Sequence, residues 1–462
     1  MLEDTIAAIS TPIGGGGIGI IRISGPEAIK ITEKIFKPAV QSNWREKKFK
    51  LVYGQVVEPG TQKIIDEVLL GVMPAPYSYT REDVVEINCH GGPAPLRKVL
   101  EKVLQGGARL AEPGEFTKRA FLNGRLDLAR AEAIIDIIRA TTDDALQLAV
   151  NQLSGALSLK LEQVQAELLN IVALVEAAID FPEDEVEEYS DKKISDRLEK
   201  LLREIENLLA GAEAGKIYRE GIRTVIVGKP NVGKSSLLNV LLREKRAIVT
   251  DVPGTTRDII EEVLNLGGVP VVLMDTAGIR ETKDAVEKIG VERTRATIEM
   301  ADLVLVVLDA AGGIDREDEE ILSLVGNKRG VMVLNKIDVN AHMNTATRDK
   351  TRNLLPGWPM VEISALQEQG IRELENTVVE LVTGGRVITG EGVMVTNVRH
   401  KNQLVKAREH LSEAIAAIQG GLTPELVAID VRGAWEAMGE INGSIITEDI
   451  VDKIFADFCI GK

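Results

Sequence analysis

The first part of the chain alternates short apolar runs with glycine and proline. Three runs, at residues 18–23, 68–73 and 84–88, have the composition and length of β-strands. A helix is expected near residues 95–104. This pattern predicts a compact α+β domain.

From about residue 120 the pattern becomes helical. Apolar residues at alternating steps of three and four predict one long amphipathic helix; they are Leu146, Val150, Leu153, Leu157, Leu161, Val164, Leu168, Ile171 and Val175. An acidic turn at residues 181–188 precedes a second helix, whose apolar face comprises Ile194, Leu198, Leu201, Ile205 and Leu208. We expect both helices to belong to a bundle.

A different fold follows the second helix. Buried-strand runs at residues 224–227, 271–274, 303–308 and 331–334 alternate with helical stretches, which is typical of a doubly wound, mostly parallel sheet. Helical periodicity returns from about Asn397. This order indicates an inserted domain, because flanking helical segments can pack together while a domain with close termini tolerates insertion.

The predicted fold is therefore multidomain α/β. It consists of an N-terminal α+β domain at residues 1–118, a first helical part at 119–216, an inserted α/β domain at 217–383 and a second helical part at 384–462. A chain of 462 residues is long enough for several cores of about 150 residues each.

Charge and composition narrow the functional classes. The net charge of -16 and the pI of about 5.0 argue against a protein that coats nucleic acid electrostatically, so an RNA partner must meet a local patch. No apolar run approaches the roughly 20 residues of a membrane-spanning helix. The two cysteines, Cys89 and Cys459, lie far apart, and we expect a cytoplasmic protein without membrane association.

Residues 228–235, with the sequence GKPNVGKS, match the phosphate-binding loop G-x-x-x-x-G-K-[ST] between an expected strand and an expected helix. Glycines let backbone N–H groups approach phosphates, Lys234 meets the β and γ oxygens, and the Ser235 hydroxyl binds Mg²⁺. The loop and its flank supply the first predicted nucleotide contacts: Asn231, Val232, Gly233, Lys234, Ser235 and Ser236.

Two further segments are expected near the phosphates. Asp275, Thr276, Ala277 and Gly278 follow an apolar strand, where a carboxylate can hold Mg²⁺ through water and the Gly278 amide can sense the γ-phosphate. The switch segment supplies Thr250, Asp251, Val252, Pro253, Gly254, Thr255 and Thr256. We assign the Mg²⁺ bond to Thr256, while Thr255 can also simply cap a turn.

The base is recognised by residues after two later strands. The Asp338 carboxylate can accept two N–H bonds from the N1 and N2 edge of guanine, and adenine offers no such donor pair. The predicted nucleotide is therefore GTP. Asn335 and Lys336 would brace the loop and cover the base, and Ser364 with Ala365 suits a backbone contact to the guanine oxygen.

Hydrolysis needs a group that orients water. Ile279 follows the Gly278 position, where many GTPases have glutamine, and its side chain cannot hydrogen-bond. Acidic alternatives are Glu281, Asp284 and Glu287, which residue chemistry alone does not rank.

Beside the nucleotide motifs the chain contains six further distinctive segments: Asp4-Thr5-Ile6-Ala7-Ala8, Gly19-Ile20-Ile21-Arg22-Ile23-Ser24-Gly25, His90-Gly91-Gly92-Pro93, Pro113-Gly114-Glu115-Phe116, Ala120-Phe121-Leu122-Asn123 and Phe458-Cys459-Ile460-Gly461-Lys462. With these segments the chain resembles, over essentially its full length, the MnmE (TrmE) family of tRNA wobble-uridine modification GTPases. Generic GTPases carry none of these segments.

The resemblance implies that residues 1–118 bind a tetrahydrofolate one-carbon carrier, 5-formyl- or 5,10-methylene-tetrahydrofolate, and form a homodimer. It also implies a heterotetramer with the FAD-containing protein MnmG (GidA), with FAD and NADH chemistry on that partner. Together such proteins add an aminomethyl or carboxymethylaminomethyl group to C5 of the wobble uridine of certain tRNAs.

The resemblance assigns further roles in the GTPase domain. Asn231, Thr250, Val252 and Thr255 would coordinate K⁺, which replaces an arginine finger when two GTPase domains meet. Glu287 would orient the water and is placed above Glu281 and Asp284 on this ground alone. Glu287, Lys234 and Thr256 are thus the expected catalytic set.

The family's folate contacts map onto Arg22, Glu86, Arg125 and Lys462. Arg and Lys suit the carboxylates of the glutamate tail, and Glu86 can accept from a pterin-like amino group. Cys459 could attack a carbon carrier, but its apolar neighbours favour a buried, inert thiol. His90 is either catalytic or a structural hydrogen-bonding group.

Two alternatives have different chemistry. A GTP-regulated RNA or ribosome-assembly switch would need none of the folate features. A GTPase acting alone as a complete transferase is disfavoured, because no Gly-x-Gly-x-x-Gly flavin fingerprint follows a first strand.

Overall fold

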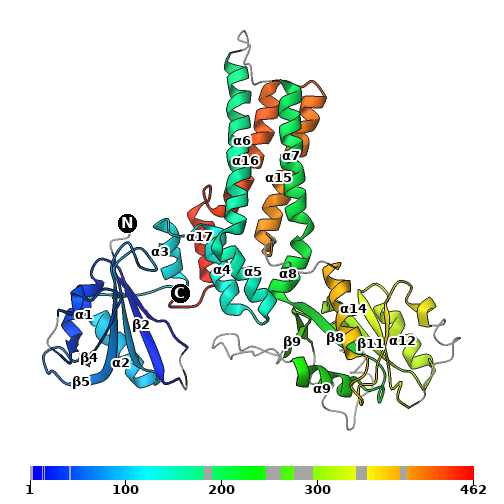
Figure 1. Ribbon diagram of the computed structural model, residues 1–462, viewed down its shortest axis with the longest axis horizontal. Helices are drawn as coiled ribbons and strands as arrows, with labels where there is room; N and C mark the ends of the chain where they lie inside the picture. Colours follow the sequence, from blue (N-terminus) through cyan, green and yellow to red (C-terminus); the bar gives the residue numbers. More distant parts are fainter. Residues whose placement is uncertain are drawn as a thin grey trace. The chain divides into compact units, whose positions relative to one another are not determined.

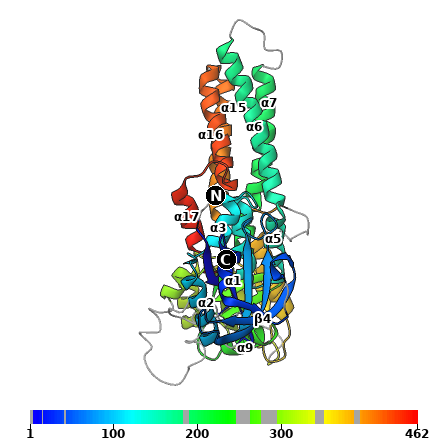
Figure 2. The same cartoon turned by 90° about the vertical axis from the view of Figure 1, so that its left-hand side faces the viewer.

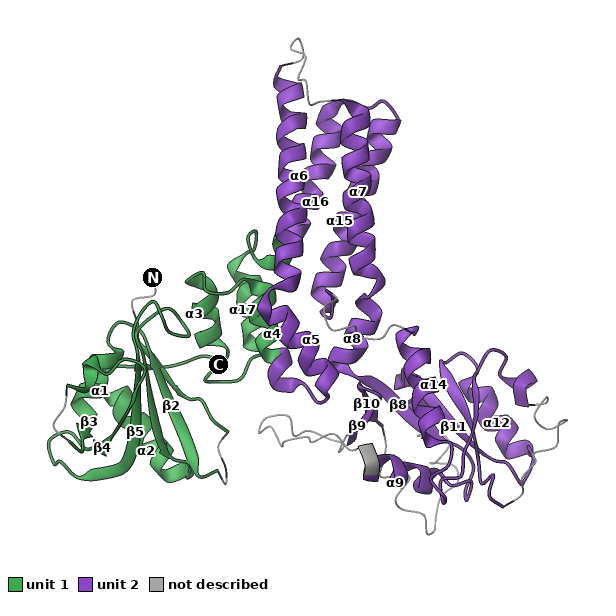
Figure 3. Cartoon of the chain, in the orientation of Figure 1, with its two compact units in different colours: residues 1–135, 251–256, 439–462 green, residues 136–250, 257–438 purple. Residues whose placement is uncertain are grey.

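The computed structural model describes residues 4–12, 14, 16–40, 43–181, 190–245, 262–274, 295–339, 351–385 and 393–462. These residues form two compact units (Figures 1 and 3). Unit 1 contains the described residues within 1–135 and 439–462, and unit 2 contains those within 136–438. Among the described helices, none combines the length and the apolar character that crossing a bilayer requires.

In the described part of unit 1, seven strands form a sheet of order β3-β4-β5-β6-β2-β1-β7. The strands are β1 Ile6–Ile9, β2 Ile18–Ser24, β3 Phe36–Pro38, β4 Leu51–Val57, β5 Ile64–Met73, β6 Val84–His90 and β7 Arg109–Leu110. Neighbouring strands are antiparallel except β1 and β7. This confirms the predicted strands at residues 18–23, 68–73 and 84–88.

Helices α1 (Ala28–Ile35) and α2 (Pro93–Gln105) cover one face of this sheet. The apolar side of α2, with Leu96, Val99 and Val103, packs in the same core as alternate sheet residues such as Ile21 and Ile87. Alternation of buried and exposed side chains is expected for a sheet with one covered face.

A second cluster of helices in unit 1 surrounds two phenylalanines. It consists of α3 (Glu115–Leu122), the first part of α4 (Leu128–Arg139) and α17 (Glu448–Ala456). Phe455 and Phe458 pack with Leu128 and Ile135 in one core. After α17 the chain pairs with the segment preceding α3 through a β-bridge between Ile460 and Pro113.

Arg119 of α3 is the largest fully buried side chain and is wholly shielded from solvent. Its guanidinium bonds to Asp4 Oδ1 at 2.7 Å, Glu115 Oε1 at 3.0 Å and Glu82 Oε1 at 3.2 Å. Arg109 shares the Asp4 and Glu115 carboxylates. A buried cation needs such compensation, so the network ties the chain's first strand to α3.

Unit 2 contains a bundle of long helices. Helices α6 (Ala156–Asp180), α7 (Asp191–Ala210), α15 (Val398–Gln419) and α16 (Pro424–Asn442) lie side by side in both views (Figures 1 and 2). The buried face of α7 comprises Ile194, Leu198, Leu201, Ile205 and Leu208, as predicted. Two shorter helices, α5 (Asp143–Ser154) and α8 (Ala212–Glu220), flank the bundle.

The single long helix predicted from Leu146 to Val175 is wrong. The chain breaks at Gly155, whose φ of 95° ends α5 in a left-handed cap before α6 begins. The two helices also bury different faces: Leu146 and Val150 are exposed on α5, which buries Ala145 and Leu148 instead. The apolar spacing of three and four residues continues across Gly155, so the sequence pattern did not show that the backbone changes direction there.

The rest of unit 2 is an α/β domain. Its described strands form a six-stranded sheet of order β13-β12-β11-β8-β10-β9, parallel except for β9. They are β8 Ile222–Val227, β9 Glu262–Leu266, β10 Val269–Leu273, β11 Leu303–Asp309, β12 Gly330–Asn335 and β13 Met360–Glu362. The four predicted strand runs are confirmed.

Helices cover both faces of this sheet, as a doubly wound fold requires. Helices α9 (Lys234–Lys245) and α14 (Ile371–Thr383) pack in a core with Ile226 of β8, whereas α12 (Arg316–Val325) packs in another with Val225. The domain boundaries predicted at residues 118, 216 and 383 remain predictions.

Replacing Arg119 with alanine should destabilise unit 1 by about 3–5 kcal/mol, because buried Glu115 would lose one of its two arginine partners and half-buried Glu82 would lose its arginine partner. Hydrogen exchange of the β1 and β2 amides in the full chain measures this loss. The control is Arg45→Ala, which removes an exposed pair with Glu33 and should cost at most about 1 kcal/mol. Equal effects of both substitutions would contradict the structural role of Arg119.

Candidate functional site

The predicted phosphate loop connects β8 to α9, as its motif requires. A side chain at Gly228, where φ is 152°, would overlap with the Val307 carbonyl, and one at Gly233, where φ is 99°, would overlap with Asn335 Nδ2. Asn231 adopts a left-handed φ of 66°. The cradle-shaped backbone of the loop therefore requires glycine at these two positions.

Lys234 already makes hydrogen bonds within this cradle. Its Nζ donates to the carbonyl oxygens of Gly228 at 2.6 Å and Lys229 at 2.9 Å. Burial lowers the pKa of the Lys234 ammonium, which has no carboxylate partner among the residues that the structure describes. A phosphate would supply that partner, so the loop fits a polyphosphate ligand. Ser235 and Ser236 lie in the first turn of α9.

Asn335 joins the phosphate loop to the segment after β13. Its Nδ2 donates to Val232 O at 2.8 Å, and its Oδ1 accepts from the Ala365 N–H at 3.0 Å. The side chain is 2% exposed, so both bonds are shielded from water. The bracing predicted for Asn335 is thus a contact between three segments far apart in the sequence.

Asp338 is oriented by a neighbour. Its Oδ1 accepts from the Ser364 hydroxyl at 2.6 Å, and within the described part of the chain Oδ2 and a further lone pair stay available to a ligand. Lys336, with a φ of 69°, pairs with Asp309 at 2.7 Å. This hydroxyl contact was not predicted, because sequence reasoning assigned Ser364 only a backbone role.

The backbone donors of Ser364 and Ala365 are engaged within the protein. The Ser364 N–H donates to Gln369 O at 3.0 Å, and the Ala365 N–H donates to Asn335 Oδ1. A contact from this segment to a guanine oxygen would have to share or replace one of these bonds, and it stays a prediction.

Lys229 is a residue that sequence reasoning missed. Its Nζ pairs with Asp315 at 2.6 Å and Asp318 at 2.8 Å, the two residues that form the capping box of α12. Burial would lower the pKa of Lys229, but the two hydrogen-bonded carboxylates raise it. The pairs fix the phosphate loop to α12, a contact that no local spacing reveals.

Several predicted site residues lie outside the described residues. They are Thr250, Asp251, Val252, Pro253, Gly254, Thr255, Thr256, Asp275, Thr276, Ala277, Gly278, Ile279, Glu281, Asp284 and Glu287. Their assigned roles stay predictions.

The second predicted site, in unit 1, centres on Arg22. Arg22 of β2 faces Glu86 of β6 in register and pairs with its Oε1 at 2.8 Å. Its Nη1 also donates to Gly461 O at 3.2 Å. Lys462 follows directly, and burial together with the nearby Arg22 cation lowers the pKa of the Lys462 ammonium. Such a poorly compensated cation suits an anionic ligand.

Tyr79 connects Arg22 to Arg125. The two guanidinium carbons lie 5.5 Å and 4.7 Å from its ring centroid, and Arg125 Nη1 donates to Tyr79 O at 2.9 Å. All four residues predicted for the folate site thus gather around one aromatic ring and the chain segment at Gly461. Tyr79 was missed, because no motif of charged residues indicates a stacking partner.

A shallow pocket of about 520 Å³ opens beside Tyr79. It is lined by Met73, Pro76, Tyr77, Ser78, Tyr79, Arg81 and Arg125. Aromatic and cationic side chains in one pocket suit a flat ring system with carboxylate substituents.

Cys459 and His90 were the two other residues considered as catalytic groups, and the structure shows the surroundings of each. Cys459 is partly exposed, so the expectation of a buried thiol is wrong. Its apolar neighbours Phe455 and Phe458 point into a core that does not enclose it. The exposed His90 ring bonds to Asp66 through Nδ1 at 2.6 Å, which is a structural hydrogen bond.

Comparisons with known proteins agree with these features. A family model of the MnmE helical domain matches residues 128–459, and one of the GTP-binding protein TrmE N-terminus matches residues 5–125. Two relatives named tRNA modification GTPase MnmE, from Desulforamulus reducens and Alkaliphilus oremlandii, are 54% and 49% identical, with 100% of each chain covered.

Among solved structures, Era in complex with MgGDPNP and a 16S ribosomal RNA segment is 31% identical. The match covers 41% of this chain and 66% of that chain, with a TM-score of 0.29.

Replacing Asn335 with alanine should weaken guanine-nucleotide binding about tenfold to a hundredfold. The substitution leaves Val232 O and the Ala365 N–H without a buried partner, so the loops lose their shared geometry. Fluorescent GDP titration measures the affinity, and exposed Asn327→Ala is the matched control. Unchanged affinity in Asn335→Ala would show that the bridge is dispensable.

Proposed function

The chain belongs to the MnmE (TrmE) family of tRNA modification GTPases, and on that premise we propose how its two sites divide the work. GTP is hydrolysed in the α/β domain of unit 2. A tetrahydrofolate one-carbon unit is held in unit 1. With an FAD-containing MnmG partner that uses NADH, the protein adds an aminomethyl or carboxymethylaminomethyl group to C5 of the wobble uridine of certain tRNAs.

The observation that carries this proposal is that Arg22 and Arg125 both lie over the Tyr79 ring, while Arg22 also pairs with Glu86 and lies near Lys462. A protein that only switches between nucleotide states does not require two guanidinium groups on one aromatic ring, nor the half-buried Lys462 beside them. Folate has a flat pterin ring and a glutamate tail with carboxylates, and bound here it supplies the one-carbon unit. The aromatic ring suits the former and the cations suit the latter.

Within the GTPase domain, Lys234 binds the phosphates and Asp338 selects guanine. The donor set of Ser235 and Thr256 suits Mg²⁺, a hard cation that prefers oxygen ligands. Asn231 would provide a side-chain oxygen to K⁺, together with Thr250, Val252 and Thr255. Glu287 would orient the attacking water.

An exposed apolar stripe supports a homodimer through unit 1. Tyr53 of β4 and Leu69 of β5 are register partners on the uncovered face of the sheet and are 52% and 40% exposed. Leu51 continues the stripe and is 63% exposed. Contiguous apolar side chains on a sheet face are typical of protein–protein interfaces. The heterotetramer with MnmG and the cytoplasmic location are part of the same proposal.

Potassium should accelerate GTP hydrolysis about tenfold or more over sodium at equal ionic strength, since the cation takes the place of an arginine finger. The stimulation should disappear in Asn231→Ala and persist in Asn327→Ala. Phosphate release from the purified protein measures both rates. Equal rates in the two salts would contradict the proposed K⁺ role without affecting the folate site.

Arg125→Ala should lower the affinity for 5-formyl-tetrahydrofolate about tenfold or more, because one charge-assisted contact is lost. Calorimetric titration of the full chain measures the affinity, and exposed Arg97→Ala on α2 is the control. Reconstitution with the FAD partner and tRNA should then yield modified uridine only when folate is supplied. Folate-independent modification, or unchanged affinity in Arg125→Ala, would contradict the proposal.

A further inference from the structure

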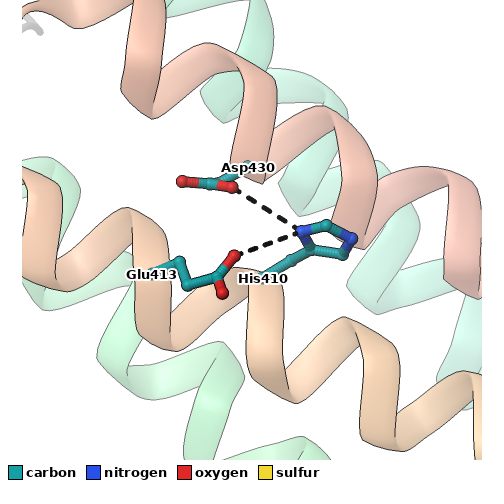
Figure 4. Close-up of side chains that lie close together, drawn as sticks. All are labelled: His410, Glu413 and Asp430. Carbon is teal, nitrogen blue, oxygen red and sulfur yellow. Dashed lines mark ion pairs between the residues drawn. The ribbon is translucent and has the colours of Figure 1, made fainter.

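Three potential metal ligands, none of them part of the two sites described above, meet in the helical bundle of unit 2. His410 and Glu413 lie one turn apart on α15, and Asp430 lies on the neighbouring α16 (Figure 4). One nitrogen or oxygen atom from each residue lies within 4.8 Å of the others. Figure 4 shows both carboxylates directed at the same imidazole nitrogen.

That nitrogen, His410 Nδ1, is shielded from solvent and has no hydrogen-bond partner in the described part of the chain. It lies 3.6 Å from Asp430 Oδ1 and 3.8 Å from Glu413 Oε2. Both separations exceed a hydrogen bond. Two ligands of one tetrahedral Zn²⁺ at about 2.0–2.1 Å are about 3.3 Å apart, so a metal ion fits between these atoms after a small movement.

The cluster contains two carboxylates and one imidazole. Among the described residues, neither Glu413 nor Asp430 pairs with a lysine or arginine. The nearby arginines on these helices have other partners, since Arg432 pairs with Glu176 and Arg408 with Glu409. Even a protonated imidazole would leave a net negative charge, whereas a divalent cation would neutralise both carboxylates.

The neighbouring helix is shaped to receive the imidazole. A Cβ at Gly433 of α16 would lie 2.8 Å from both Cε1 and Nε2 of His410, so any larger residue would displace the ring. Glycine is less favourable than alanine within a helix, so its presence at this position calls for a packing reason. The close approach of Gly433 holds the His410 ring with Nδ1 toward the carboxylates. This steric fit is an observation separate from the metal-binding chemistry of the three side chains.

We propose that His410, Glu413 and Asp430 form a binding site for a divalent transition-metal ion such as Zn²⁺, which joins α15 to α16. One imidazole and two carboxylates suit Zn²⁺ and its first-row neighbours. The exposed Glu413 leaves room for water as the remaining ligand. Because the ion would link two adjacent helices, it should stabilise the bundle against unfolding.

The test uses the full chain, freed of metal and nucleotide, and Co²⁺ as a spectroscopic probe for Zn²⁺. Wild type should bind one Co²⁺ per chain at this site, with visible absorption that Zn²⁺ displaces. His410→Ala and the isosteric Asp430→Asn should each weaken binding about tenfold or more. Saturating Zn²⁺ should raise the unfolding temperature of wild type by about 5 °C, and that of Asp430→Asn by much less.

Two control variants separate this cluster from other ligands. Glu409→Gln removes a neighbouring acid of α15, and His90→Ala removes the exposed imidazole of unit 1; both should bind Co²⁺ as wild type does. The proposal is overturned if no Co²⁺ spectrum appears, or if Asp430→Asn retains the wild-type spectrum and affinity. Asp430→Asn keeps the side-chain volume, so its result does not depend on repacking around His410.

Discussion

Gly215 and Val395 lie against each other where the chain leaves the helical bundle and returns to it. A Cβ at Gly215 would overlap with the Val395 carbonyl, and Val395 itself is buried. Two polar contacts lie beside this close approach: the Thr396 hydroxyl donates to Gln152 Oε1 at 3.2 Å, and Lys401 pairs with Glu213. An inserted domain needs adjacent exit and entry points, because otherwise the bundle's two sequence halves could not pack together. The bundle and the GTPase domain both depend on this contact.

The same dependence on distant residues governs both candidate sites. Asn335 holds the phosphate loop and the segment at Ala365 in one geometry, although 103 residues separate it from Val232. In unit 1, Arg22 bonds to Gly461, which is 439 residues away. Each contact satisfies polar groups that would be costly to bury alone. The sites are therefore as much a product of the tertiary fold as of their motifs.

The contrast between local motifs and contacts made by the tertiary fold explains which features could be predicted from the sequence. The phosphate loop, the parallel strands and the buried face of α7 follow from local spacing, and all were predicted. Gly155 was missed because the apolar period continues across it, although the backbone turns there. Lys229 and Tyr79 were missed because their partners, Asp318 and Arg125, are brought close only by tertiary packing. Roles assigned to residues such as Thr256 and Glu287 remain predictions.

The inserted domain is also held by a contact that does not involve its chain connections. The hairpin between β9 and β10 turns at Gly268, where a Cβ would overlap with the Asp144 carboxylate of α5. Burial, assisted by Asp143, raises the pKa of Asp144. Together with the contact between Gly215 and the Val395 carbonyl, this contact joins the α/β domain to the helical part of unit 2 at two separate points.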